Sequence, residues 1–300
     1  MTPALTAFQL ARRYGRSWAL RDCSFEVPPG AVAALIGPNG AGKTTLIEIA
    51  VGLLQPSEGR ISVFGEPVRG ESRALLSRVG FVAQEAPLYR SFTVEDMLNV
   101  GRHLNPHWDD SLARDRLRRL SIPLDRTCGR LSGGQQAQVA LTLAVAKRPE
   151  LLILDEPVAR LDPLARREFL ESLMEIVAGG DLTVLLSSHV ISDLERVSDH
   201  LVVLSEGTIL LTGATERLLA EHLVLSGPRE DIARLAQRCT VVDARTSERQ
   251  MTLLVRRPES LMDPSITVSG IDLEELVLAY LRRRPLPHVA VQTDLVASAS

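Results

Sequence analysis

Residues 37–45 read GPNGAGKTT, and they follow directly on the apolar run AVAALI at 31–36. A short apolar run predicts a buried strand, and the residues from Lys43 onward have the pattern of a helix. Glycines between a strand and a helix let consecutive backbone N–H groups turn inward and form a concave site for an anion. The N-terminal end of the helix adds a partial positive charge at the same point. The stretch therefore predicts a loop that holds phosphate.

The residue types in this loop indicate how it would bind a nucleotide. The Lys43 ammonium can reach the β- and γ-phosphates, and the Thr44 hydroxyl can bind Mg²⁺. The loop residues expected at the phosphates are Gly37, Pro38, Asn39, Gly40, Ala41, Gly42, Lys43, Thr44 and Thr45. Kinases, GTPases, ATPases and repair proteins remain open at this point. None of the asparagines begins the Asn-Lys-x-Asp element that guanine-specific GTPases use, so adenine is favoured.

Length and composition narrow the class of protein. A chain of 300 residues with 45% hydrophobic and 24% charged residues allows one domain of about 200 residues with a smaller appendage. The net charge of −3 gives no electrostatic footprint for nucleic acid. The three cysteines fit neither a disulfide framework nor a zinc site and favour a reducing compartment. We expect no signal segment and no membrane span, since every apolar run is far shorter than about 20 residues.

Short apolar runs alternate with amphipathic segments, which predicts an α/β fold with a largely parallel sheet. The predicted strands are 23–27, 31–36, 60–64, 79–83, 151–154, 182–187, 201–204 and 208–212. The predicted helices are 43–53, 134–147, 163–178, 190–198 and 214–221. Glu206-Gly207 predicts a hairpin between the last two strands. Residues 93–150 interrupt the alternation with two further helices, and they predict an inserted helical subdomain.

Beyond residue 222 the character of the sequence changes. Residues 239–257 predict two short strands around a polar turn. A helix is predicted after Asp272, with an apolar stripe made of Leu273, Leu276, Val277, Tyr280 and Leu281. This helix either packs on its own core, which we favour, or binds a regulator. We therefore predict a domain at 1–222 and a small α+β appendage at 223–300, with a frayed tail.

Two adjacent carboxylates follow the apolar run 151–154 in the sequence LLILDEP. Asp155 would lie at a strand end beside the phosphate loop, where it can hold Mg²⁺ through water. Since side chains alternate along a strand, Glu156 points differently and can polarise the water that attacks the γ-phosphate. Two carboxylates at a strand end can also simply cap the next turn, but the phosphate loop upstream favours the catalytic interpretation.

Two more predicted strands end in polar residues, and a second glycine pair follows. Gln84 could bind Mg²⁺ and water, and His189 could donate a hydrogen bond to a γ-phosphate; alone, each is an ordinary strand-end residue. Such groups gather where open α/β sheets bind ligands. In LSGGQ, at 131–135, Ser132 can cap a helix whose first N–H groups are exposed. In a generic protein LSGGQ would only be a well-capped helix start.

The order of these motifs resembles the ATP-binding subunit of an ABC transporter. The resemblance covers residues 2–222 and rests on Tyr14, GPNGAGKTT, Gln84, LSGGQ, LLILDEP, Leu161-Asp162 and His189. It implies a P-loop NTPase (RecA-like) core with an antiparallel N-terminal β subdomain and an inserted helical subdomain. Residues 30–60 and 151–205 are most similar to bacterial subunits that serve separate export-type permeases of the ABC-2 kind.

The resemblance implies a role for each motif residue. Glu156 would be the general base and His189 the sensor of the γ-phosphate, while Tyr14 would stack on adenine. The catalytic set is then Glu156, His189, Gln84 and Lys43, and the metal set is Thr44, Gln84 and Asp155.

The family resemblance also explains the second glycine pair, through a head-to-tail dimer. Ser132, Gly133, Gly134 and Gln135 would contact ATP held by the other subunit, with Asp162 near the same seam. ATP would thereby close the dimer, and hydrolysis would release it.

We therefore predict an ATP-hydrolysing subunit that powers export, as a homodimer or paired with a sibling subunit. It would lie in the cytoplasm, peripheral on the inner face of the cell membrane, under a separately encoded transmembrane permease. Residues 84–95 would border the groove that receives the permease. Two alternatives remain: a soluble ABC-type switch acting on ribosomes or DNA, and a nucleotide-binding module with little turnover in which Arg160 blocks closure.

Overall fold

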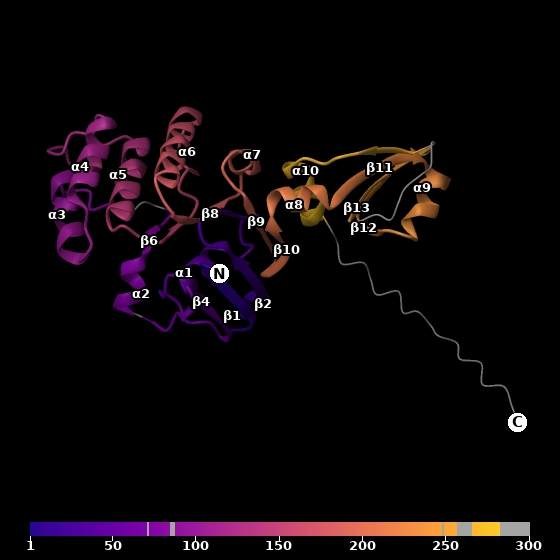
Figure 1. Cartoon of the computed structure of the whole chain (residues 1–300), viewed down its shortest axis with the longest axis horizontal. Coiled ribbons are helices and arrows are strands. Elements are labelled where there is room, and N and C mark those ends of the chain that lie inside the picture. The colour runs from indigo at the N-terminus through magenta and orange to yellow at the C-terminus, as the bar shows by residue number, and fades with distance from the viewer. Residues whose placement is uncertain (71, 85–87, 248, 257–265, 283–300) are drawn as a thin grey trace, which may run out of the picture. The chain divides into compact units, whose positions relative to one another are not determined.

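The computed structural model describes residues 1–70, 72–84, 88–247, 249–256 and 266–282. The chain divides into two compact units, Met1–Ala220 and Glu221–Ser300. The first unit holds two sheets and a group of helices, and the second holds a further sheet (Figure 1). The predicted frayed tail lies outside the described residues.

A six-stranded sheet in the order β10-β9-β3-β8-β7-β6 organises the first unit. Its strands are β3 (Val32–Ile36), β6 (Val79–Val82), β7 (Leu151–Leu154), β8 (Thr183–Ser188), β9 (His200–Ser205) and β10 (Thr208–Ala214). All neighbouring pairs are parallel except β9 and β10, which form the predicted hairpin. Both turn residues, Glu206 and Gly207, have positive φ, as a tight hairpin turn requires. The largely parallel sheet predicted from the alternation is confirmed.

Helices α1 (Lys43–Ala50), α6 (Pro163–Ala178), α7 (Ile191–Leu194) and α8 (Thr215–Ala220) each follow a strand of this sheet, and α2 (Arg73–Arg78) leads into β6. Helix α6 begins and ends where the sequence predicted, because Asp162 caps its first turn by accepting hydrogen bonds from the N–H groups of Leu164 and Ala165. Helix α7 is shorter than the predicted 190–198.

A second, antiparallel sheet in the order β2-β1-β4-β5 completes the core. Its strands are β1 (Leu5–Tyr14), β2 (Ser17–Val27), β4 (Glu58–Val63) and β5 (Glu66–Pro67). The sequence did not predict β1. Its register shifts after Ala7, next to Gln9 with a φ of 47°, so the buried positions do not keep a period of two. A bulge hides the alternation by which strands are recognised.

The helical subdomain has its own core. It contains α3 (Val94–Leu104), α4 (Asp110–Arg119) and α5 (Gly133–Ala146), which lie together in Figure 1. Helix α3 starts with the predicted Thr93/Asp96 capping box. At Gly101 a Cβ would lie 2.5 Å from the ring of Trp108, so the absence of a side chain lets the indole pack on this helix.

Over its described residues, the second unit contains a four-stranded sheet and the helices α9 (Arg229–Ala236) and α10 (Leu273–Arg282). The strand order is β12-β13-β11-β14, with β11 (His222–Pro228), β12 (Thr240–Thr246), β13 (Gln250–Arg256) and β14 (Thr267–Ser269). The sequence predicted β12, β13 and α10 but missed the other three elements. In the buried interior His222 Nε2 lies 2.9 Å from the Tyr280 hydroxyl.

Cys23 and Cys128 are buried in the first unit. Burial raises the pKa of Cys23 to about 11 and also raises the pKa of Cys128, so both thiols are poor nucleophiles.

Within the described ranges, none of the helices combines the length and apolar character needed to cross a bilayer.

Candidate functional site: a phosphate cradle at the edge of the parallel sheet

The candidate site lies at the carboxyl ends of four adjacent strands, β3, β8, β7 and β6. A cavity of about 450 Å³ opens there. Its lining contains Ala19, Asn39, Gly40, Gly42, Lys43, Thr44, Thr45, Gln84, Glu156, Ala159 and His189. Residues from five separate parts of the sequence therefore meet at the edge where open α/β sheets bind ligands.

The loop from β3 to α1 is shaped by glycines at two close approaches. A Cβ at Gly37 would lie 2.1 Å from the carbonyl oxygen of Leu204, and a Cβ at Gly42 would lie 2.5 Å from that of Ala19. Gly42 also has a φ of 107° and caps α1. Any other residue at these positions would displace the loop. The fold thus holds the N–H groups of the loop at the start of α1, in a cradle that fits a phosphate.

The ammonium of Lys43 crosses this cradle and is almost fully buried. It donates hydrogen bonds to the carbonyl oxygens of Gly37 (2.8 Å) and Pro38 (3.2 Å). It also forms an ion pair with Glu156, with 3.1 Å between Nζ and Oε1. An ammonium has three N–H donors, so these three acceptors satisfy it completely.

Glu156 occupies a constrained position at the end of β7. Its φ is 45°, in the left-handed region that a residue other than glycine seldom adopts. Its second oxygen, Oε2, accepts a hydrogen bond from His189 Nδ1 at 2.8 Å. Burial raises the pKa of Glu156, but the hydrogen bond and charge of Lys43, followed by those of His189, outweigh burial and hold this pKa below its usual value. The carboxylate is therefore ionised at neutral pH.

Ser187 is a residue of this site that the sequence analysis missed. Its buried Oγ donates to Asp155 Oδ1 at 2.7 Å and accepts from the backbone N–H of Glu156 at 2.8 Å. One hydroxyl thus fixes both acidic residues. The only signal lay in strand register, because Leu154 pairs with Leu186 and the next residues are Asp155 and Ser187.

A second missed contribution comes from the hairpin turn between β9 and β10. The N–H of Gly207 donates to the carbonyl oxygen of Ala41, and its own carbonyl oxygen accepts from the N–H of Arg21. A Cβ at Gly207 would lie 2.7 Å from the carbonyl oxygen of Ala19. The turn therefore holds the phosphate loop against β2.

The predicted metal set offers oxygen donors only. Thr44 and Gln84 line the cavity, while Asp155 is 2% exposed and is not among the lining residues that the structure describes. Hydroxyl, amide and carboxylate oxygens are the ligands that Mg²⁺ takes in proteins, so these residues fit that ion.

Tyr14 does not belong to the cavity lining among the described residues. Its ring is half exposed at the end of β1, and the guanidinium carbon of Arg12 lies 4.8 Å from the ring centroid. Ala19 contributes to the lining from the same sheet. The predicted stacking of Tyr14 on adenine stays a prediction.

The LSGGQ segment lies outside the cavity and forms an exposed helix tip. Ser132 caps α5 by accepting from the N–H of Gln135, whose Oε1 accepts from the N–H of Ser132 in return. A Cβ at Gly134 would lie 3.0 Å from the Cβ of Ala165. The tip therefore packs closely against the first turn of α6, beside Asp162, and its exposed residues face away from the chain's own core.

Comparison with known sequences identifies the relatives of this chain. The family model described as ABC transporter matches residues 20–159. The chain is 32% identical over 300 residues to "Nod factor export ATP-binding protein I" of Paraburkholderia xenovorans, covering 89% of this chain and 97% of that protein. The protein of the same name from Sinorhizobium fredii is 36% identical over 225 residues, which are 73% of this chain and 65% of that protein.

Solved structures give a matching result. An ATP-binding subunit of an ABC transporter superposes with a TM-score of 0.64 at 30% identity, covering 72% of this chain and 92% of that one. CbiO1 from Clostridium perfringens, part of the ABC transporter complex cbiONQ, has a TM-score of 0.64 at 28% identity over 79% of this chain and 96% of its own.

The lowered pKa of Glu156 predicts a pH dependence of stability. A carboxyl group with a lower pKa in the folded chain than its unfolded value of 4.5 adds stability above that pH, and the gain is lost as pH falls through the folded pKa. The difference in unfolding free energy between the parent and Glu156→Gln should be largest above about pH 5 and shrink in acid. Urea denaturation at a series of pH values measures it.

Glu171→Gln provides the control, because this exposed residue forms an ion pair with Arg167 on the helix surface, away from the site. Its stability should stay close to that of the parent at every pH. A Glu156→Gln difference that stayed constant into strong acid would contradict the assigned pKa direction.

Proposed function

This chain belongs to the ATP-binding subunits of ABC transporters and is an ATPase of that family, and we propose that it powers export through a separate membrane permease. Support for export comes from relatives that are named as export ATP-binding proteins and that this chain matches over nearly their full length. Support for a separate permease comes from CbiO1, which is one part of a transporter complex. We place the chain in the cytoplasm, on the inner face of the membrane.

The observation that carries the proposed mechanism is the cluster of Lys43, Glu156 and His189 at one cavity. The N–H groups of the loop and the Lys43 ammonium bind the phosphates. Glu156, ionised and facing the cavity, accepts a proton from water as the water oxygen attacks the γ-phosphorus. The bond from that phosphorus to the ADP oxygen then breaks, and the phosphate product leaves. His189 donates a hydrogen bond toward the same phosphate.

The saturation of Lys43 couples binding to catalysis. Its three donors already have acceptors, so a bound phosphate oxygen must take the place of at least one of them. Of these three acceptors, Glu156 is the side chain, and its carboxylate can rotate away from Lys43. The other two are backbone carbonyl oxygens of the loop itself. Phosphate binding would then release Glu156 toward water at the moment when its role as a base begins.

Thr44, Gln84 and Asp155 are the residues that would hold Mg²⁺. When bound, this ion would supply charge neutralisation at the phosphates. Ser187 keeps the Asp155 carboxylate in a single orientation.

We propose further that the exposed Ser132 tip closes on nucleotide held by a second subunit. The tip presents helix N–H groups and a partial positive charge, but it lies outside the cavity of its own chain. Two chains placed head to tail would complete two sites, each with a loop from one chain and a tip from the other. The partner would be a second copy or a sibling subunit.

The soluble switch on ribosomes or DNA has no support from the comparisons, since the relatives named above are transporter proteins. The other alternative is a module with little turnover, in which Arg160 blocks closure. The rate of ATP hydrolysis by the parent chain, measured in the assay below, tests it.

Replacing Glu156 by Gln should abolish ATP turnover. An amide cannot accept the proton, and general-base catalysis contributes roughly 10²- to 10⁴-fold to the rate. ATP should still bind, so the variant should accumulate as an ATP-dependent dimer in size-exclusion chromatography. The control is Glu150→Gln at the other end of β7, where the side chain pairs with Arg78 at the surface. Parent-like turnover by Glu156→Gln would show that another residue is the base.

Replacing Ser187 by Ala should lower turnover about tenfold or more through misplacement of Glu156, at a stability cost of about 1–2 kcal/mol. Thr183→Ala is the matched control, because Thr183 is buried on the same strand and accepts the N–H of Gly30 far from the site. It should cost similar stability with little loss of turnover. Equal losses of turnover in both variants would reduce Ser187 to a structural residue.

A further inference from the structure

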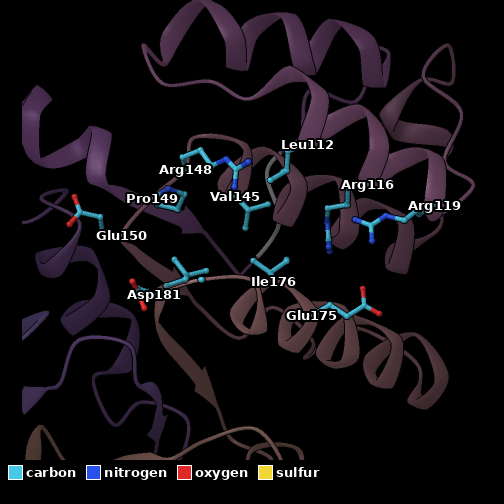
Figure 2. Close-up of a pocket in the computed structure, with 13 residues that line it drawn as sticks. Leu112, Arg116, Arg119, Val145, Arg148, Pro149, Glu150, Glu175, Ile176 and Asp181 are labelled. Carbon is cyan, nitrogen blue, oxygen red and sulfur yellow. The ribbon is translucent and has the colours of Figure 1, made fainter.

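A second cavity of about 450 Å³ lies in the first unit, away from the phosphate loop (Figure 2). It is bounded by α4, by the C-terminal end of α5 and by the C-terminal end of α6. Glu150 and Leu182, which precede β7 and β8, also line it. The cavity therefore lies at the edge of the parallel sheet opposite to the nucleotide site. Its size suits a small organic molecule.

Arg116 is the most unusual residue of this cavity. Its exposure is only 4%, yet the hydrogen bonds of its guanidinium within the described residues all go to neutral oxygens. Nε donates to Thr142 Oγ1 at 3.1 Å, and Nη2 donates to Gln138 Oε1 at 2.8 Å and Ser172 Oγ at 2.7 Å. All these acceptors are neutral. Nη1 makes no hydrogen bond within the described residues, but it is not fully buried, so a ligand can reach it.

The charges around Arg116 leave an excess of positive charge at its end of the cavity. Burial, and then repulsion from Arg119, lowers the pKa of Arg116 to about 10, and Glu175 on α6 offsets this only in part. Arg119 forms no ion pair with any residue that the structure describes. Asp181 lies at the far end of the cavity, as Figure 2 shows. A buried cation without a paired anion is costly, so this end of the cavity is electrostatically incomplete.

Part of the cavity lining is apolar, although the charged Arg148, Glu150 and Asp181 also line it. Leu112 from α4, Val145 from α5 and Ile176 from α6 face it in Figure 2, and Pro149 closes one side. A fully hydrated ion such as inorganic phosphate would leave this surface uncovered. A molecule with one anionic group and an apolar body would satisfy both parts of the lining.

We propose that this cavity binds a small organic carboxylate, with the carboxylate at Arg116 and Arg119 and the apolar body against Val145 and Ile176. The ligand bridges the helical subdomain and α6. It contacts the ends of α5 and α6 that lie opposite to the Ser132 tip and the Asp162 cap. This site is independent of the proposed export function, since none of its residues belongs to the nucleotide cavity.

Binding of hexanoate to the full-length chain tests the proposal, measured by ligand-observed NMR titration. The neutral isostere hexanamide should bind at least about tenfold more weakly, because a charge-assisted hydrogen bond is lost. Arg119→Gln should weaken hexanoate binding by about tenfold for the same reason. Arg119 is exposed, so the variant should fold. Glu175→Gln should strengthen binding, because it removes the opposing carboxylate.

Arg118→Gln is the control on the same helix, since Arg118 is exposed and pairs with Asp115. Its affinity for hexanoate should equal that of the parent. Equal hexanoate affinities in Arg118→Gln and Arg119→Gln would overturn the proposal, and so would equal binding of hexanoate and hexanamide. The absence of saturable hexanoate binding to the parent would do the same.

Discussion

The buried ion pair between Lys43 and Glu156 is the interaction on which the candidate site depends. It joins the phosphate loop after β3 to the acidic end of β7, with both side chains less than a tenth exposed. Removing one member of such a pair costs about 3–5 kcal/mol, because the other charge is left buried and unpaired. The pair also keeps Glu156 ionised, and it places the carboxylate within reach of any phosphate that Lys43 binds.

The rest of the fold supports this pair from several directions. Glycines at 37 and 42 permit the close approaches that aim the loop at the sheet edge, and the turn at Gly207 holds the loop from outside. Ser187 fixes the backbone of Glu156, and His189 binds its second oxygen. The exposed Ser132 tip is different, since it caps α5 and packs on α6 but lies outside the nucleotide cavity of its own chain. A cradle on one face and an exposed helix end on another are what a head-to-tail dimer would join.

The sequence predicted those parts of the structure that local physics determines. The start of α1 after the glycine loop, the bounds of α6 and the strand at 151–154 need only neighbouring residues, and all were placed correctly. Ser187 could not be predicted, because its role depends on the register between β7 and β8, which are distant in the chain. Strand β1 was missed since a bulge at Gln9 breaks its alternation. The hydrogen bonds of Arg116 could not be predicted either, because they join three helices that only tertiary packing brings together.

The central claim is that the Ser132 tip of one chain closes on the phosphate loop of another. Cysteine cross-linking tests this claim most directly. Asn39 and Ser132 are both exposed, and they would be replaced by Cys together with Glu156→Gln. The account predicts a covalent dimer that forms on oxidation with ATP and not without nucleotide. A control with Cys at Arg118 in place of Ser132 should stay monomeric. A cross-link that forms only within single chains would contradict the account. So would a covalent dimer whose yield is the same with and without ATP.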